Sequence, residues 1–384
     1  MQVYLDNSAT TKCYEEVIDI TSQIMREDYG NPSSLHKMGM VAEKHIKDAK
    51  EIIAKQLKIK DKEIIFTSGG TESNNLAIIG GARANHRSGK HIITTKIEHP
   101  ATLEAMKYLE GEGFEITYLD ARPDCMINLE ELQNALRKDT ILVSIMYVNN
   151  EIGLIADMAN IAKVIKEYNP KILIHVDAIQ AFGKIKILPN KLNIDMMSVS
   201  AHKIHGPKGC GFLYVKEGSK VTPTTYGGGQ QGGRRSGTEN VIGIAGMATA
   251  IRVGCERFNE NIEEIKKLRD IFLESLVEIE DVVINSGSSE YHAPHIINAS
   301  FIGIKSEVLL HALEAKGIYV SSGSACASNH PKPSDTLTAI GRTQEEIDSA
   351  IRFSLSQFNT TEEIEYTIDT IKELVVNLRK YIKH

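Results

Sequence analysis

Four short segments combine residue types that can do chemistry, and each follows a run of apolar residues. They are residues 68–73 (SGGTES), 98–100 (EHP), 177–180 (DAIQ) and 200–203 (SAHK). Taken singly, each has an ordinary structural explanation, such as a glycine turn, a capping aspartate or a lysine that reaches solvent. Together they supply an amine that captures an aldehyde, a carboxylate, an anion cradle and a stacking aromatic ring. That combination predicts a site for pyridoxal phosphate.

The elements around these segments place them at one edge of a sheet. Strand-like runs at 63–67, 91–95, 114–119, 140–148, 172–176 and 196–200 alternate with amphipathic stretches, which begin near residue 71 and continue at 101–110, 129–137 and 158–168. This alternation predicts an α/β fold with a mostly parallel sheet covered on both faces. Ligands in such folds bind at the carboxyl ends of the strands, where the four segments fall.

The pattern changes after the glycine-rich segment at 226–240 (YGGGQQGGRRSGTEN). A long helical stretch at about 241–279, bent near Gly254, leads to short strands at 282–285, 296–301, 318–320 and 351–355 and to helices at 307–316 and 362–381. This predicts a smaller α+β domain. Residues 227–232 match GxGxxG, but no convincing strand precedes them and no helix follows at once, so we discount dinucleotide binding.

Composition excludes several classes of protein. The 384 residues carry 44 Lys+Arg against 50 Asp+Glu, with a net charge of −6 and no basic block, so neither a nucleic-acid nor a membrane partner is favoured. The N-terminus lacks a signal-peptide pattern, and no apolar run approaches the about 18–20 residues that span a bilayer. The five cysteines have no CxxC spacing, so we expect no metal site, no disulfide framework and a cytoplasmic location.

Ten segments carry a family resemblance. They are residues 4–11 (YLDNSATT), 29–34 (YGNPSS), 67–75 (TSGGTESNN), 98–101 (EHPA), 147–153 (YVNNEIG), 175–180 (HVDAIQ), 200–209 (SAHKIHGPKG), 234–240 (RRSGTEN), 321–326 (SSGSAC) and 351–355 (IRFSL). In these the chain resembles the pyridoxal-phosphate cysteine desulfurases of the NifS/IscS type, in the class V aminotransferase group. The resemblance implies a fold-type-I transferase. Its large domain (residues 15–258) would hold a mostly parallel mixed seven-stranded sheet covered by helices, and residues 1–14 and 259–384 would form the small α+β domain.

The resemblance also implies a role for each site residue. Lys203 would bond the cofactor aldehyde, Asp177 would face the ring nitrogen, and His99 would stack on the ring and handle a proton. The remaining cofactor contacts would come from Gln180 at the phenolic oxygen and from Gly70, Thr71, Ser200 and His202 at the phosphate. Thr238 would reach the phosphate of a neighbouring subunit, which implies a homodimer. Asn31, Asn150 and Arg352 would bind the substrate carboxylate end.

Within this family resemblance, Cys326 is the residue that distinguishes a desulfurase from a generic transaminase. Small and polar residues surround it, which predicts an exposed, mobile loop, whereas Cys13, Cys125, Cys210 and Cys255 are expected to be buried. Its thiolate would accept sulfur from L-cysteine as a persulfide, leave L-alanine, and pass the sulfur to an acceptor protein, either an iron–sulfur scaffold or a tRNA-thiolation enzyme. The alternatives are a selenocysteine lyase, another class V aminotransferase or lyase, and a catalytically inactive homologue that acts as a binding partner.

Overall fold

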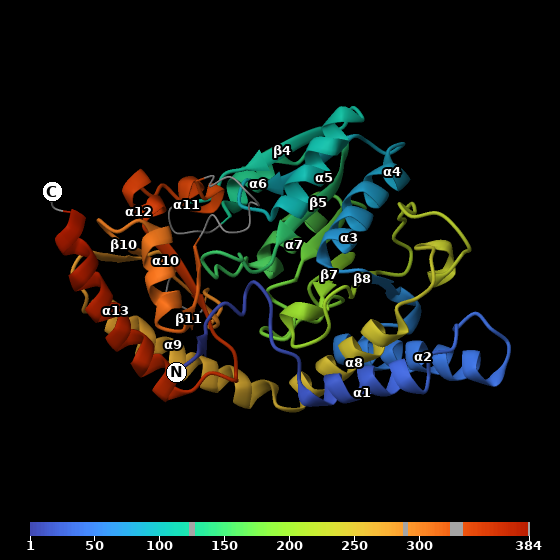
Figure 1. Ribbon diagram of the computed structural model, residues 1–384. Coiled ribbons are helices and arrows are strands. Elements are labelled where there is room, and N and C mark those ends of the chain that lie inside the picture. Colours follow the sequence, from blue (N-terminus) through green and yellow to red (C-terminus); the bar gives the residue numbers. More distant parts are fainter. Residues whose placement is uncertain (123–126, 287–290, 323–332, 383–384) are drawn as a thin grey trace.

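The computed structural model describes residues 1–122, 127–286, 291–322 and 333–382, and it places them in a larger and a smaller lobe (Figure 1). The larger lobe contains a seven-stranded sheet with the order β2-β8-β7-β6-β5-β3-β4. β8 is antiparallel to both of its neighbours, and the other neighbouring pairs are parallel. The strands are β2 (Ile64–Thr67), β3 (His91–Thr95), β4 (Glu115–Leu119), β5 (Thr140–Met146), β6 (Leu173–Asp177), β7 (Met196–Ser200) and β8 (Gly211–Val215). The predicted mixed, mostly parallel sheet is therefore confirmed, although the sequence pattern did not single out β8.

Helices cover both faces of this sheet, as neighbouring residues of one strand show. Ile92 packs in a core cluster with Met106, whereas Ile93 packs in another with Ile53 and Ile161. Because successive side chains of a strand point to opposite faces, both faces are buried. The helices of this lobe are α1 (Glu15–Arg26), α2 (Lys37–Leu57), α3 (Gly70–Asn75), α4 (Gly81–Asn85), α5 (Pro100–Gly111), α6 (Leu129–Ala135), α7 (Met158–Tyr168) and α8 (Val241–Glu256), with a π-helical turn (Leu76–Gly80) between α3 and α4.

The smaller lobe has its own sheet and core. A four-stranded antiparallel sheet has the order β12-β13-β10-β9, and β1 pairs in parallel with β11. Its strands are β1 (Val3–Tyr4), β9 (Val282–Ile284), β10 (Ile296–Phe301), β11 (Ile318–Tyr319), β12 (Ser321–Ser322) and β13 (Ala350–Ser354), and its helices are α9 (Phe258–Val277), α10 (Ser306–Ala315), α11 (Asp335–Ala339), α12 (Gln344–Asp348) and α13 (Thr361–Ile382). Val3 and Leu5 pack in one core cluster with residues of α9, β13 and α13, so the N-terminal segment contributes to this core. The exact domain limits stay a prediction.

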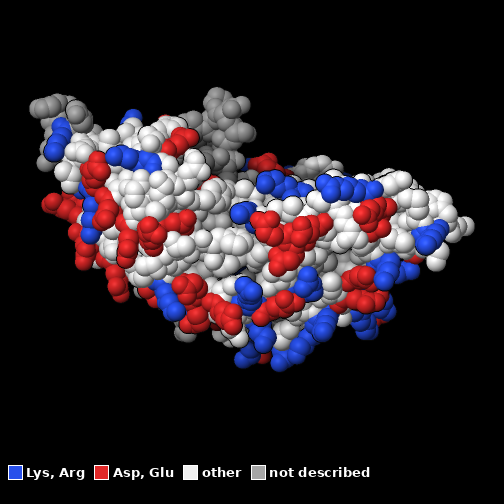
Figure 2. Space-filling model, turned by 60° about the horizontal axis from the view of Figure 1, so that its bottom comes forward, with Lys and Arg blue, Asp and Glu red and all other residues white. Residues whose placement is uncertain are grey.

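Expectations from the sequence also concern membrane spans, metal sites, cysteine burial and the distribution of charge. Within the described ranges, no helix has the length and apolar character needed to cross a membrane. In the same part of the chain, no group of three or more His, Cys, Asp or Glu side chains is placed to hold a metal ion. Cys13, Cys210 and Cys255 are free thiols, but only Cys210 is buried, so the expectation for the other two was wrong; Cys125 lies outside the described residues. Acidic and basic side chains share the face drawn in Figure 2, as the mixed charge pattern of the sequence predicts.

Candidate active site

A pocket lies at the carboxyl edge of the large sheet, where ligand binding was predicted. The N-terminal segment, the start of α3, the ends of β5, β6 and β7, and β13 all contribute to it. Its lining residues are Ser8, Gly70, Thr71, His99, Met146, Val148, Asn150, Asp177, Ile179, Gln180, Ser200, His202, Lys203 and Arg352. The structure therefore brings together all the predicted site residues except Asn31, Thr238 and Cys326.

Asp177 ends β6 and is buried in the pocket. Asn74 Nδ2 donates to its Oδ2 at 2.7 Å, and the backbone N–H of Ile179 donates to Oδ1 at 3.0 Å. Both donors are neutral. Burial raises the pKa of Asp177 even though these bonds and the nearby His99 and Lys203 oppose the shift. The carboxylate thus lies in a site that only partly compensates its negative charge.

Lys203 ends a single 3₁₀ turn (Ala201–Lys203) that directly follows β7. Its Nζ donates to the carbonyl oxygen of Ser8 and, at 2.7 Å, to that of Ala9. Gln180 Nε2 donates to the same Ser8 carbonyl at 2.9 Å. The N-terminal segment therefore holds both side chains at the pocket through its backbone carbonyl oxygens.

The start of α3 provides a close-fitting turn beside Ser200. Gly69 has a φ of +149°, a conformation that favours glycine. A Cβ on Gly70 would lie 2.2 Å from Ile179 Cδ1, so the neighbouring position also requires glycine unless that side chain moves. Thr71 follows with an exposed side chain. Backbone N–H groups at a helix start, with hydroxyl groups beside them, form a site for a phosphate.

Two histidines of the pocket are held neutral. His99 caps α5, and its Nδ1 accepts from the N–H of Ala101 at 3.1 Å. Burial lowers the pKa of His99, although Asp177 acts in the opposite direction. Burial, with a contribution from Lys203, lowers the pKa of His202 to about 4. Uncharged imidazoles suit ring stacking and proton transfer.

Arg352 lies at the β13 side of the pocket and is 4% exposed. Nη1 donates to the carbonyl oxygen of Asn150 at 2.9 Å, and Nη2 pairs with Asp6 Oδ1 at 3.0 Å. Each terminal nitrogen carries a second N–H, so the guanidinium keeps donors for a further carboxylate. Asn150 and Arg352 are thus neighbours in the structure, as their predicted shared role requires.

Two predicted site residues of the described part of the chain, Asn31 and Thr238, do not line this pocket. Asn31 is exposed, and its Oδ1 accepts from the N–H of Ser33 at 2.9 Å. Thr238 is also exposed. Cys326 lies outside the described residues. The predicted role of Thr238, contact with a neighbouring subunit, stays a prediction.

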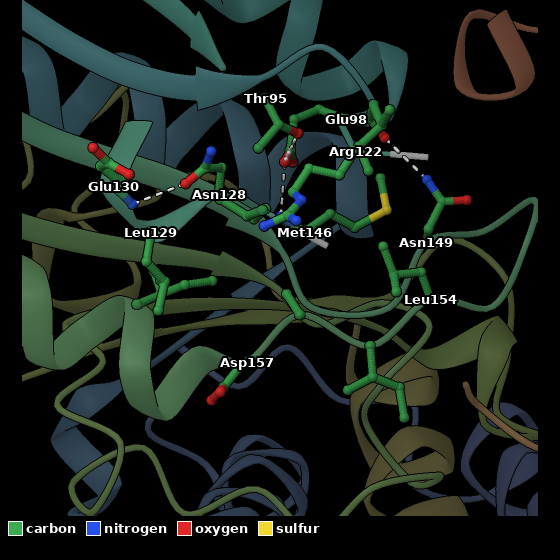
Figure 3. Close-up of a pocket in the computed structure, with 15 residues that line it drawn as sticks. Thr95, Glu98, Arg122, Asn128, Leu129, Glu130, Met146, Asn149, Leu154 and Asp157 are labelled. Carbon is green, nitrogen blue, oxygen red and sulfur yellow. Dashed lines mark hydrogen bonds between the residues drawn. The ribbon is translucent and has the colours of Figure 1, made fainter. Parts of the chain in front are cut away.

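A second cavity adjoins the first, and Met146 lines both (Figure 3). Glu98 Oε1 accepts from the Thr95 hydroxyl at 2.7 Å and from the N–H of Met146 at 2.9 Å, while Oε2 is buried without a partner. Burial raises the pKa of Glu98 to about 8. The side chain is therefore mostly protonated at neutral pH, and its hydrogen bonds join β5 to the segment that carries His99.

The comparisons with known proteins agree with this geometry. The family model for aminotransferase class-V matches residues 3–367, and the chain therefore belongs to the aminotransferase class-V family. Cysteine desulfurase IscS of Dictyoglomus turgidum is 44% identical over 98% of this chain and 95% of its own length. Cysteine desulfurase IscS of Methanosarcina thermophila is 45% identical, over 98% and 93%. A solved NifS-like protein superposes with a TM-score of 0.93 at 39% identity, covering 98% of this chain and all of that one.

Enzymes of this family use pyridoxal phosphate, and the pocket fits that group. Asp177 offers a buried, under-compensated carboxylate to a protonated ring nitrogen. Gly70 and Thr71, at the start of α3, line the same pocket, and the free backbone N–H groups of a helix start suit a phosphate. The amine of Lys203 lines the same pocket. The predicted family, fold and cofactor are confirmed.

Sequence reasoning missed several residues that build this site. Ser8 contributes a backbone carbonyl, and Asn74 contributes the amide that holds Asp177. Asp6 pairs with Arg352. The motifs contain all three residues, but only the tertiary structure shows what they contact.

Proposed function

We propose that this enzyme is a pyridoxal-phosphate-dependent cysteine desulfurase, which removes sulfur from L-cysteine, releases L-alanine and holds the sulfur as a persulfide on Cys326. The names of its relatives agree with this activity. The observation that carries the proposal is one pocket in which Asp177 and Lys203 meet Arg352. An amino acid bound there has its amino group near Lys203 and its carboxylate near a guanidinium.

The cofactor supplies a covalent link to the substrate amine and withdraws electrons from the α-carbon. Arg352 and Asn150 bind the substrate carboxylate and fix the α-carbon beside Lys203. The Lys203 amine removes the α-proton and later returns a proton to the carbon skeleton. His99, uncharged at neutral pH, takes the proton of the substrate thiol.

Sulfur transfer assigns a step to Cys326. Its thiolate attacks the substrate sulfur, the carbon–sulfur bond breaks, and the bonding electron pair returns to the carbon skeleton, which is protonated and leaves as alanine. Cys326 keeps the sulfur as a persulfide. An acceptor protein, an iron–sulfur scaffold or a tRNA-thiolation enzyme, then receives it.

We also propose a homodimer. Leu35 is 97% exposed, Tyr226 74% and Tyr29 69%, and exposed apolar side chains of this size favour burial against a partner. Two of them flank Asn31, and Tyr226 opens the segment that carries Thr238. A second copy would bring these exposed site residues to the other subunit's pocket. Sedimentation of a fully active monomer would contradict the dimer.

The free thiols of Cys13, Cys210 and Cys255 support the proposed cytoplasmic location.

The test is a single turnover with L-cysteine in the absence of reductant, followed by intact-protein mass spectrometry and an alanine assay. We expect one added sulfur per chain and stoichiometric alanine in the wild type, and neither in Cys326→Ala. Cys255→Ala, at a half-buried thiol, serves as the matched control and should behave as the wild type. Alanine or pyruvate formed without an adduct, and unaffected by Cys326→Ala, would instead indicate a lyase or transaminase.

A further inference from the structure

Glu72 is an acidic residue directly beside Gly70 and Thr71, the predicted phosphate contacts. Its Oε2 accepts from the backbone N–H of Ser68 at 2.7 Å, and this bond joins the turn that follows β2 to the first residues of α3. The carboxylate therefore helps to shape the turn. Its negative charge also repels a phosphate bound at Gly70 and Thr71. Anion binding at this turn thus requires a positive charge close to Glu72.

Arg235 supplies that charge from the glycine-rich segment (residues 226–240). Its Nε donates to Glu72 Oε1 at 2.7 Å and its Nη2 to Oε2 at 3.2 Å, so the two groups form a bidentate pair. The side chains of Arg235 and Glu72 are 24% and 18% exposed, which partly shields the pair from water. Burial raises the pKa of Glu72, but hydrogen bonds from Arg235 and Ser68 outweigh it and hold that pKa below its ordinary value. The carboxylate is therefore ionised at neutral pH.

The turn that carries the phosphate contacts is attached on two sides. Gly69 packs against the start of β8 so closely that a Cβ on Gly211 would lie 2.8 Å from the Gly69 Cα. The Glu72–Arg235 pair joins the same turn to the glycine-rich segment. The backbone N–H groups of the turn are thus placed by a backbone contact and by an ion pair.

The glycine-rich segment has other attachments to the larger lobe. Arg234 Nη2 donates to the backbone carbonyl of Lys62 at 2.6 Å, and Gln231 Oε1 accepts from the N–H of Phe66 in β2 at 3.2 Å. These bonds hold the segment to the lobe independently of Arg235. The bidentate contact of Arg235 therefore does more than fasten the segment: it neutralises a carboxylate beside the pocket.

We propose that Arg235 is a positioning residue for the cofactor phosphate, which neutralises Glu72 and holds its carboxylate against the turn at residues 68–71. The proposal deepens the proposed function, because it rests on the phosphate contacts proposed for Gly70 and Thr71. Arg235 is not among the residues that line the pocket, so it acts through Glu72. Without Arg235, an uncompensated carboxylate would lie beside a bound phosphate dianion.

The test measures equilibrium binding of two probes to the cofactor-free protein by absorbance. Pyridoxal phosphate carries the phosphate, whereas pyridoxal carries a hydroxyl group in its place. The variants are Arg235→Ala, Glu72→Gln and the double variant that combines them. Arg235→Lys keeps the charge without the planar fork. Arg234→Ala removes the same charge from the adjacent position, which bonds a carbonyl instead of a carboxylate, and is the matched control.

We expect Arg235→Ala to weaken binding of pyridoxal phosphate by at least about tenfold, because an unpaired carboxylate then acts on the phosphate in a partly shielded site. Binding of pyridoxal should stay close to that of the wild type. The double variant should recover most of the affinity for pyridoxal phosphate, since the repelling charge is gone. Glu72→Gln alone keeps an acceptor for the N–H of Ser68 and should bind pyridoxal phosphate as tightly as the wild type or more tightly. Arg235→Lys and Arg234→Ala should resemble the wild type.

Equal losses for both probes in Arg235→Ala would indicate a general disruption of the pocket and overturn the proposal. A double variant that binds no better than Arg235→Ala would also overturn it, because that result is expected if Arg235 only holds the segment that carries Thr238. If Arg235→Ala fails to fold, weakened binding of pyridoxal phosphate in Glu72→Gln alone would contradict the charge argument. Neither probe requires desulfuration. The expected binding pattern in an enzyme that forms no persulfide would therefore reject the proposed function while supporting the role of Arg235.

Discussion

Replacing Asp177 by asparagine separates the role of its charge from the role of its shape. The asparagine Oδ1 can still accept from the N–H of Ile179, which now bonds the carboxylate at 3.0 Å. The new amide would face Asn74 Nδ2, but Asn74 Oδ1 is buried without a partner. A flip of the Asn74 amide therefore restores a donor–acceptor pair. We expect the cofactor-free variant to fold, with a Tm equal to or above that of the wild type.

Cofactor binding should respond in the opposite way. The variant loses the buried charge that would face the ring nitrogen, and removing one partner of such a pair costs about 3 kcal/mol or more. This weakens binding by on the order of a hundredfold. The assay titrates cofactor-free protein with pyridoxal phosphate by absorbance, and calorimetry gives the Tm. Asp157→Asn, at a helix cap, is the control. Binding within threefold of the wild type, or a cofactor-free variant that fails to fold, would refute this reasoning.

Three more changes test other parts of the site. Arg352→Lys keeps a charge beside Asp6 but loses the planar fork, so the KM for L-cysteine should rise at least about tenfold in steady-state assays; an unchanged KM would place the substrate carboxylate elsewhere. Glu98→Gln should match the wild type in stability at pH 4.5 and exceed it at pH 9 by up to about 4 kcal/mol in denaturant unfolding. The folded-state pKa of Glu98 is raised from 4.5 to about 8, so wild-type stability falls as the pH rises between these values; parallel curves for both proteins would contradict this. Gly70→Val directs a side chain at Ile179 Cδ1, 2.2 Å from the ideal Cβ, and should weaken cofactor binding tenfold or more; unaltered binding would mean that the cradle lies elsewhere.

The sequence predicted the reactive side chains of this enzyme better than the atoms that hold them. Asp177 and Lys203 were predictable because Asp177 ends one apolar strand run and Lys203 closely follows another, and parallel strands bring such ends to one edge. The bond from Gln180 to the backbone carbonyl of Ser8 was not predictable, since it joins residues 172 positions apart. Any residue type can present that carbonyl. The bond from Lys184 Nζ to the backbone carbonyl of Lys203 carries no residue-type signal either.

The buried carboxylate of Asp177 lacks a full positive counter-charge in the pocket, so the stability of the protein should depend on the bound cofactor. Burial raises the pKa of Asp177, so ionising it in the cofactor-free chain lowers stability as the pH rises above the ordinary aspartate range. A protonated ring nitrogen reverses this cost by supplying the missing positive charge. The Asp6–Arg352 pair already joins the N-terminal segment to β13 and needs no cofactor. Cofactor binding should therefore stabilise the β6 side of the pocket more than the β13 side, and hydrogen exchange at Asn74 and Ile179 should slow on cofactor binding more than exchange within β13.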